Sequence, residues 1–454
     1  MMVPQSAIQK FRESLRGPSL CPGEPGYDEV RAIPNAMINR KPAIVARCAG
    51  AADVITCVRF GREHDLLVSV RGGGHSVAGK SVCDDGLMID LSAMMKGIRV
   101  DPARRTVRAE PGLRLGEFDR ETQAFGLATT MGLLPNTGIS GLTLGGGFGN
   151  LMAKHGLALD NLIGVDVVTA DGRLLTASAD ENEDLFWGIR GSSGNLGVVT
   201  SLEYRLHELG PVFGGAVLHP VNKTREVVQF CSEYAETLPG EVVLQAGAFT
   251  LPDGMKVFAM AVCYCGSSLS EGEKVLQPMR NFGSPIADMI TTMTYVQMQS
   301  FFEPFFQLGL YTYVKSNFLQ QLSDEAAETI GEWAGKSPSP HTFAPFIEHW
   351  HGAATRVGVE ETAFPHRRPA WNVIAWSVWK DPADTDKNIQ WTRDYWTAMQ
   401  PFLVEGSYVN YQSDEGQAVA RSAYGVNYDR LAVLKAKYDP TNFFRMNHNI
   451  SPAS

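Results

Sequence analysis

The sequence has little of what several classes of protein require. Its 454 residues carry a net charge of −9 and no block of basic residues, which argues against a nucleic-acid-binding surface. No apolar run approaches the roughly 18–20 residues that a membrane-spanning helix needs. The first ten residues lack the apolar core of a secretion signal. We therefore expect a cytoplasmic protein without nucleic-acid or membrane partners.

Cysteine is scarce and scattered as well. The seven cysteines are odd in number and contain no C-x-x-C pair, so a disulfide framework or a structural zinc site is not indicated. We expect Cys263 and Cys265 to pack in the core as small hydrophobic residues. His349 and His351 have a spacing that a metal site could use, but without a third ligand the pattern favours pocket lining or sheet surface. We predict no metal site.

Glycine, in contrast, is abundant, and the excess is confined to the front of the chain. Residues 1–210 hold 29 of the 45 glycines, about twice the average usage of roughly 7%. Many of them fall in two clusters, at 72–79 and 138–149. Consecutive glycines expose backbone N–H groups in a concave nest that suits a pyrophosphate. Neither cluster forms the G-x-G-x-x-G of a Rossmann unit, so a Rossmann dinucleotide site is not favoured. We predict instead that the two loops together embrace one extended dinucleotide.

One segment imitates the phosphate-binding loop of nucleotide hydrolases. Gly74–Ser81 matches G-x-x-x-x-G-K-S after a strand predicted at 66–70. In a true P-loop the motif opens a helix whose N-terminus receives the phosphates. Here 82–86 is a poor helix start, and a strand is predicted from Leu87 onward. We interpret the match as coincidental, and a nucleotide hydrolase stays an alternative to be tested.

The remaining pattern predicts an α+β fold. A boundary near 207–212 is indicated by the fall in glycine content and by Gly210-Pro211. Alternation at 376–379 predicts sheet in the aromatic-rich middle section. Helices are predicted at 50–60, 115–125, 184–189, 222–237, 323–334, 385–400 and 429–437. Strands are predicted at 66–70, 87–91, 97–100, 106–109, 165–170 and 197–206.

Several motifs, in order along the chain, resemble the FAD-binding domain of berberine-bridge-enzyme-like flavin oxidases. These belong to the vanillyl-alcohol-oxidase superfamily of PCMH-type flavoproteins. The resemblance rests on segments at 71–76, 138–149, 154–157, 160–162, 168–172, 185–191, 408–411 and 437–445. The resemblance is strong over about 40–206 and 406–450. It is weaker between them, where the segments at 313–316 and 362–367 are the most similar to the family.

The resemblance implies a division of the chain. Residues 1–208 would form a PCMH-type FAD-binding domain of two α+β subdomains. Residues 209–405 would form a substrate-binding domain, an antiparallel sheet covered by helices. Residues 406–454 would be a C-terminal segment that returns to the FAD domain.

The resemblance also implies how FAD is held. His75 would bond covalently to the 8α carbon of the flavin. Many relatives add a cysteinyl link, but this chain has Leu134 at the cysteine position, and Cys83 has no such role, so we expect a single link. The cofactor-binding residues that it implies are Arg71, Gly72, Gly73, Gly74, His75, Ser76, Gly79, Thr137, Gly138, Ser140, Gly141, Thr143, Gly146, Gly147, Gly149, Asn150, Gly197, Val198 and Asn410.

For catalysis, the resemblance points to Tyr411 as the base, with Tyr408 and Asn410 lining the flavin or substrate side. A phenol has an ordinary pKa of about 10, so it would need a nearby cation or the flavin's field to lower it. If the segment is a strand, Tyr408 and Tyr411 face opposite sides, and one of them is structural. Further pocket-lining candidates are Tyr313, Lys315 and His351.

The expected function is that of an FAD-dependent oxidase. A hydride passes from a substrate carbon to flavin N5, and O2 reoxidises the flavin with release of H2O2; the small Thr137 leaves room for O2 near the flavin. The substrate is expected to be a small organic molecule, with a tilt toward an aromatic or polycyclic secondary metabolite. Alternatives are a dehydrogenase with a non-oxygen acceptor and an oligosaccharide or sugar oxidase. The protein is expected to be a monomer or a homodimer.

Overall fold

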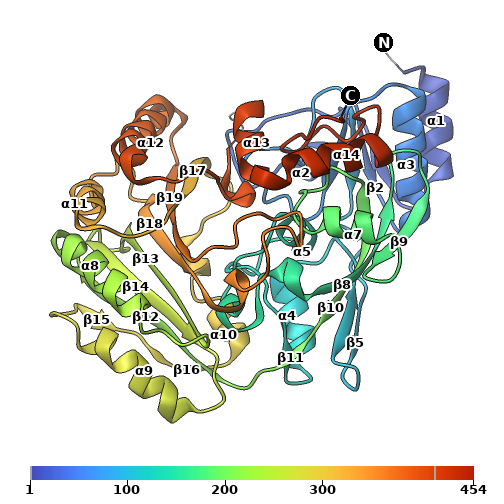
Figure 1. Ribbon diagram of the computed structural model, residues 1–454. Helices are drawn as coiled ribbons and strands as arrows, with labels where there is room; N and C mark the ends of the chain where they lie inside the picture. Colours follow the sequence, from blue (N-terminus) through green and yellow to red (C-terminus); the bar gives the residue numbers. More distant parts are fainter. Residues whose placement is uncertain (1–2, 414–415, 454) are drawn as a thin grey trace.

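The computed structural model describes residues 3–413 and 416–453, and it contains the predicted α+β architecture. Three principal sheets follow one another along the chain, and the C-terminal helices return to the front half (Figure 1). Each of these sheets lies within one of the predicted ranges, although the boundaries at 208 and 405 remain a prediction. None of the helices in the described part of the chain is long and apolar enough to cross a lipid bilayer.

The first sheet contains the strand that leads into the first glycine loop. Its order is β1-β2-β4-β3, and β2, β4 and β3 run parallel. The predicted helix at 50–60 is α3, which connects two parallel strands and buries Val54, Cys57 and Val58. The strands are β1 (Ser19–Leu20), β2 (Ile44–Arg47), β3 (Val68–Arg71) and β4 (Leu87–Asp90), and the helices are α1 (Gln5–Ser14), α2 (Tyr27–Arg31) and α3 (Ala51–Glu63).

The segment that matches the P-loop motif is not followed by a helix. After β3 the segment 72–86 runs through turns and bends directly into β4 at Leu87. A helix N-terminus that could receive phosphates is therefore missing from this described segment, as the sequence predicted.

The second sheet is antiparallel and has the order β5-β6-β10-β8-β9. Its strands are β5 (Ile98–Asp101), β6 (Thr106–Ala109), β8 (Leu162–Val168), β9 (Leu174–Ser178) and β10 (Val198–Arg205). Helices α4 (Leu115–Gln123), α5 (Ile139–Leu144), α6 (Met152–His155) and α7 (Glu183–Ile189) accompany it, with a 3-10 turn η1 (Ala158–Asn161). A short pair, β7 (Leu127–Ala128) with β11 (His207–Glu208), leads to the third sheet.

The third sheet has eight strands in the order β15-β12-β14-β13-β18-β19-β17, with β16 paired to β12. Four helices cover its outer face, and its other face is turned toward the front half of the chain (Figure 1). The strands are β12 (Val212–Pro220), β13 (Val242–Thr250), β14 (Lys256–Tyr264), β15 (Ala287–Asp288), β16 (Thr291–Met293), β17 (Tyr311–Leu319), β18 (Phe343–Trp350) and β19 (Ala370–Trp379). The covering helices are α8 (Thr224–Ala235), α9 (Leu269–Asn281), α11 (Asp324–Trp333) and α12 (Thr385–Met399), and α10 (Tyr295–Gln299) lies at the base.

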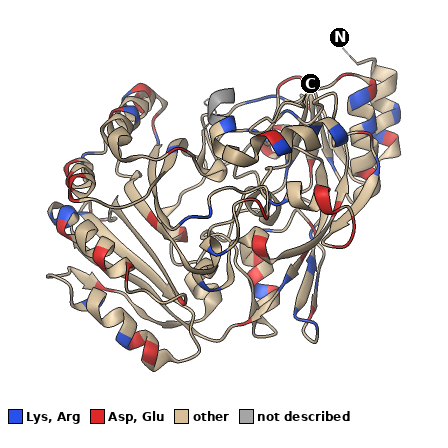
Figure 2. Cartoon of the chain, viewed as in Figure 1, with Lys and Arg blue, Asp and Glu red and all other residues tan. Residues whose placement is uncertain are grey.

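Charged residues of both signs are interspersed on the outer helices, whereas the strands of the third sheet are almost free of them (Figure 2). In the six long strands that the structure describes, only Lys256, Lys315 and Glu348 are charged. Glu348 is fully buried. A buried carboxyl group is costly unless it has partners, so this position needs an explanation.

The C-terminal helices α13 (Gln417–Tyr424) and α14 (Tyr428–Tyr438) complete the core of the front half. Leu431, Leu434 and Tyr438 pack in the same hydrophobic cluster as Leu185 and Ile189 of α7. These helices therefore pack against the front half of the chain.

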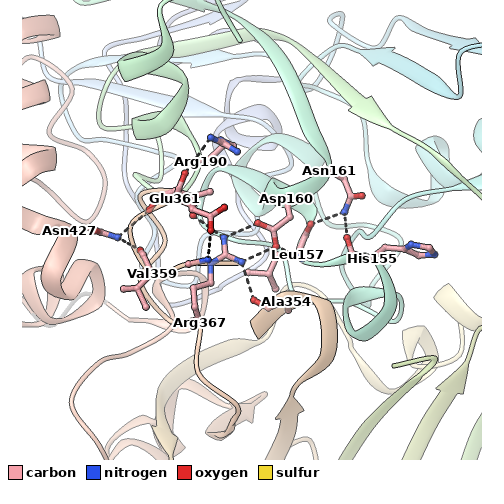
Figure 3. A network of polar contacts seen from close by, with 12 residues as sticks. His155, Leu157, Asp160, Asn161, Arg190, Ala354, Val359, Glu361, Arg367 and Asn427 are labelled. Carbon is pink, nitrogen blue, oxygen red and sulfur yellow. Dashed lines mark hydrogen bonds and ion pairs between the residues drawn. The ribbon is translucent and has the colours of Figure 1, made fainter. Parts of the chain in front are cut away.

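A buried ion pair connects the front half to the segment that follows β18. The Arg367 guanidinium donates to both carboxylate oxygens of Asp160 at 2.8 Å, and it also donates to Thr362 Oγ1 at 2.8 Å and to the Ala354 carbonyl at 3.2 Å. Asn427 ties the C-terminal segment to the same loop through the carbonyls of Val359 and Thr362 (Figure 3). Arg367 and Asp160 side chains are 1% and 9% exposed, so each needs the other to offset desolvation.

This ion pair generates a stability prediction. Asp160→Asn leaves the buried guanidinium without its counter-charge, and we expect the free energy of unfolding to fall by about 3–5 kcal/mol. The control is Asp429→Asn, which breaks the exposed pair Arg421–Asp429 and should cost at most about 1 kcal/mol. Urea unfolding of both variants checks this; equal losses would contradict a role for Asp160 in joining the two halves.

Candidate active site

A cavity of about 510 Å³ lies where the front half, the inner face of the third sheet and the C-terminal segment meet. One end is formed by the two glycine loops, through residues 72–76 and through Thr137, Gly138 and Gly141. The other end is formed by strands β12, β14, β13, β18 and β19 and by the aromatic segment 301–306. Residues 409–412 line the wall between them. Parts of the chain that are far apart in sequence therefore share one site.

The glycine loops contact each other through bare backbone. A Cβ atom built on Gly73 would lie 2.2 Å from the Gly138 nitrogen, and one on Gly138 would lie 2.2 Å from the Gly73 nitrogen. One on Gly72 would lie 2.4 Å from Ser140 Oγ, which itself donates to the Pro111 carbonyl at 2.9 Å. No side chain larger than hydrogen fits at Gly73 or Gly138 without separating the loops.

His75 lies at the edge of the first loop and lines the cavity. Burial lowers the pKa of its imidazole to about 4, so the ring is neutral at physiological pH. Its buried Nε2 has no hydrogen-bond partner within the described residues. This buried nitrogen therefore has a free hydrogen-bonding position that a ligand in the cavity could use.

The structure divides the predicted cofactor-binding residues into two groups. Nine of them line the cavity, namely Gly72, Gly73, Gly74, His75, Ser76, Thr137, Gly138, Gly141 and Asn410. The others lie behind this lining, namely Arg71, Gly79, Ser140, Thr143, Gly146, Gly147, Gly149, Asn150, Gly197 and Val198. Some of these support the loops: Thr143 Oγ1 pairs with the Tyr204 hydroxyl at 2.9 Å, and Asn150 donates to Gln299 at 2.8 Å.

No cysteine is among the described residues that line this cavity. Leu134 lines it, and Cys83 is buried elsewhere, against Ser69. The predicted core positions of Cys263 and Cys265 are confirmed, since both are buried.

The segment around Tyr408 is not a strand, so the condition under which its two tyrosines would face opposite sides is not met. Residues Val409–Tyr411 form a 3-10 turn, closed by the Tyr411 N–H donating to the Tyr408 carbonyl at 2.9 Å. The two rings therefore meet edge to face, with centroids 4.8 Å apart. The i→i+3 geometry of such a turn brings residues three apart to one side.

Tyr408 supports the second glycine loop from behind and does not line the cavity. Its buried hydroxyl accepts hydrogen bonds from the backbone nitrogens of Gly147 and Phe148, at 2.9 and 3.2 Å, and from Asn410 at 2.9 Å. Burial raises the pKa of Tyr408 to about 12. This tyrosine holds the C-terminal segment against the glycine loop.

Tyr411 does line the cavity, and its hydrogen-bond partner is a carboxyl group. Its hydroxyl donates to Glu348 Oε1 at 3.0 Å. Burial and the negative charge of Glu348 raise the pKa of Tyr411 well above its ordinary value, so the phenol keeps its proton. Of the two influences that could lower this pKa, a nearby cation and the flavin's field, the described residues around the hydroxyl offer a carboxyl group instead of the cation.

Glu348 is the functional candidate that the sequence analysis missed. It projects from β18 into the cavity, and its second oxygen accepts from Asn372 Nδ2 at 2.9 Å. Burial raises the pKa of its carboxyl group to about 7, so it can exchange a proton near neutral pH. One signal was available: a single carboxyl group in the six long strands of a sheet that are otherwise almost uncharged.

The other pocket-lining candidates lie elsewhere. Tyr313, Lys315 and His351 are outside the cavity lining: Lys315 packs over Trp396, Arg393 packs over Tyr313, and His351 Nε2 pairs with the Val242 carbonyl at 2.8 Å. The rings of His349 and His351 stack 4.4 Å apart. In the described chain no group of three or more His, Cys, Asp or Glu side chains is placed to hold a metal ion.

Comparison with known proteins agrees with this geometry. A family model described as an FAD binding domain matches residues 42–178, and one described as berberine and berberine-like matches residues 407–451. An FAD-linked oxidoreductase of Dictyostelium discoideum is 33% identical over 98% of this chain and 97% of its own length. A carbohydrate oxidase of Microdochium nivale is 27% identical, with 99% of this chain and 96% of that protein covered.

Solved structures agree as well. The crystal structure of 6-hydroxy-D-nicotine oxidase from Arthrobacter nicotinovorans matches with a TM-score of 0.89 and 28% identity, covering 97% of this chain and 99% of that one. The regions matched by the two family models include both glycine loops and the C-terminal segment that carries Tyr411. The chain therefore belongs to the berberine-like family of FAD-linked oxidoreductases.

Proposed function

We propose that this oxidoreductase is an oxidase that removes a hydride from a small organic substrate, an aromatic or polycyclic metabolite. When bound, FAD supplies the hydride acceptor at its N5 atom and passes the electrons to O2, which leaves as H2O2. The observation that supports this most directly is that the Tyr411–Glu348 pair and both glycine loops line one cavity. A proton acceptor and a dinucleotide cradle would then face the same substrate.

The residues that line the loop end of the cavity fit FAD. Gly72, Gly73 and Gly138 present backbone without side chains, which allows close approach of a pyrophosphate to N–H donors. His75 offers a neutral imidazole whose Nε2 lacks a partner within the described chain. A neutral nitrogen is nucleophilic, and we propose that it carries the flavin covalently through the 8α carbon, as a single link.

The attachment is tested with denatured protein. We expect the yellow colour of the wild type to stay in the acid-precipitated pellet, because a covalent bond survives unfolding. His75→Ala should bind flavin only reversibly and release it into the supernatant. Cys83→Ser is the control and should keep the colour in the pellet. Release of flavin from acid-precipitated wild type would contradict the covalent link.

The pair on the opposite wall can take up a proton. Tyr411 keeps its own proton because burial and the neighbouring carboxylate both raise its pKa. Glu348, with a pKa of about 7, is the group that can accept one near neutral pH. A substrate O–H or N–H proton would pass to Tyr411 Oη while the tyrosine proton moves to Glu348 Oε1, 3.0 Å away. Asn372 holds the other carboxylate oxygen in place.

This proposal predicts a specific pH dependence. Glu348 must be ionised to accept a proton, so the rate of anaerobic flavin reduction should rise with pH through about 7 and level off above it. Glu348→Gln should remove this dependence and lower the rate about 10²- to 10⁴-fold. The measurement is stopped-flow flavin reduction, with the substrate taken from a peroxide-release screen over alcohols, sugars and polycyclic natural products.

Asp119→Asn is the matched control for this experiment. Asp119 is also a fully buried carboxyl group whose pKa burial raises to about 7, but it lies outside the cavity and accepts from Gln299 at 3.0 Å. The variant should keep the wild-type pH profile. A Glu348→Gln enzyme with an unchanged profile would contradict the assignment. Reduced flavin that persists in air would indicate a dehydrogenase with another acceptor.

A further inference from the structure

The inner face of the third sheet carries a polar row at the base of the cavity. Strand pairing places Gln245 opposite Glu348, and Glu348 opposite Asn372, so the three side chains share one face. Gln245 and Glu348 line the cavity. Glu348 already accepts from Tyr411 and Asn372.

This row has more acceptors than the chain satisfies. Gln245 Oε1 and Asn372 Oδ1 are buried, and neither finds a hydrogen-bond partner in the described part of the chain. A carboxylate offers about four lone-pair sites, of which Glu348 uses two. A ligand that donates a hydrogen bond would satisfy groups that are otherwise left unpaired.

Beyond the polar row the same face becomes apolar and then aromatic. Phe346 is two residues from Glu348 along β18, and strand pairing places it opposite Gly247 and Ile374. Trp376 also lines the cavity. It is four residues from Asn372 along β19, which corresponds to about 13 Å at about 3.3 Å per residue. The polar row therefore closes one end of an apolar slot.

Aromatic rings from the 301–306 segment form the roof of this slot. Phe306 stacks on Phe343, with centroids 4.3 Å apart and planes at 5°, and meets Trp376 edge-on at 5.6 Å. Phe305 meets Phe249 edge-on at 5.2 Å. Aromatic faces and edges favour other aromatic rings between them.

The slot also disfavours two other kinds of substrate. Glu348 is the sole carboxyl side chain in the described cavity lining, so an anionic group at the polar row would meet a like charge. A saccharide would bring hydroxyl groups along its whole length, and those beyond the row would face Phe346, Ile374 and Trp376 without partners.

We propose that the substrate is a flat aromatic molecule carrying an alcohol or amine as a hydrogen-bond donor, and that saccharides and carboxylates are excluded. The inference rests on the proposed function, since it places the donor at Gln245 and Glu348, next to Tyr411. The aromatic part lies against the rings of Phe306, Trp376 and Phe249, which line the cavity beside the polar row. The donor-bearing carbon is then the one presented to the loop end of the cavity.

The test uses the flavin-loaded protein with its flavin reduced beforehand, at pH 8 without oxygen, and follows ligand binding by the change in absorbance of the reduced flavin. The probes are 2-naphthylmethanol, 2-naphthoate and cellobiose. We expect the alcohol to bind, the carboxylate to bind at least roughly tenfold more weakly because of like-charge repulsion, and cellobiose to cause no change. Cellobiose binding as tightly as the alcohol would overturn the inference.

Variants locate the binding energy. Phe306→Leu keeps an apolar side chain but removes the ring, and it should weaken alcohol binding about 2- to 10-fold. Phe230→Leu is the control: it removes a ring that stacks on Phe282 at 4.2 Å outside the cavity, and it should leave binding unchanged. Equal effects of the two variants would contradict the aromatic slot.

The two proposals fail in different ways. Flavin reduction with H2O2 release from cellobiose, but not from aromatic alcohols or amines, would overturn the aromatic substrate class in both proposals and leave only the oxidase reaction standing. Selective binding of the alcohol, with no flavin reduction by any aromatic alcohol or amine, would support the slot and contradict the oxidase.

Discussion

The contact between Gly73 and Gly138 is the constraint on which the site depends. Two loops from different parts of the front half touch through backbone atoms, with no room for a Cβ on either side. Strand β3 delivers the first loop, while the bridge between Arg114 and Gly138 anchors the second. If the loops separated, the end of the cavity that carries His75 would lose its shape. The glycine surplus of the front half thus has a specific structural purpose at these positions.

The rest of the molecule places reactive side chains in the cavity next to the two glycine loops. Tyr408 supports the second glycine loop from behind, and the same short turn places Tyr411 in the cavity. The third sheet contributes Glu348 from a strand whose neighbours are uncharged, so that burial brings its pKa near 7. Arg367 and Asp160 join the loop after β18 to the front half. The cofactor side and the proton-accepting side are therefore held by separate, rigid contacts.

Much of this architecture was predictable from local sequence. Gly74–Ser81 could be separated from a true P-loop because the residues that follow cannot open a helix, and the structure places turns there. The helices α3, α8, α11 and α12 were predicted from the sequence, α3 from the 3–4 spacing of its residues. His75 and the glycine loops were identified through motifs, because close backbone approach leaves a clear trace in sequence.

What could not be predicted depends on contacts between distant segments. Glu348 and Tyr411 are 63 residues apart, and their hydrogen bond requires both the register of β18 and the return of the C-terminal segment. The 3-10 turn at Val409–Tyr411 could not be told from a strand in the sequence, because three residues show no distinguishing period. Tyr313, Lys315 and His351 were placed in the pocket without knowledge of which way their strands face.

The most direct test of this account is the FAD affinity of Gly73→Ala protein, measured in a His75→Ala background in which the cofactor binds reversibly. A Cβ 2.2 Å from the Gly138 nitrogen must push the loops apart, and such overpacking costs about 1–3 kcal/mol. We expect cofactor binding about 5- to 150-fold weaker than for Gly210→Ala in the same background, where the added methyl meets no atom of the described chain within 4 Å. Equal FAD affinities of the two double variants would contradict the claim that bare backbone contact builds the cofactor site.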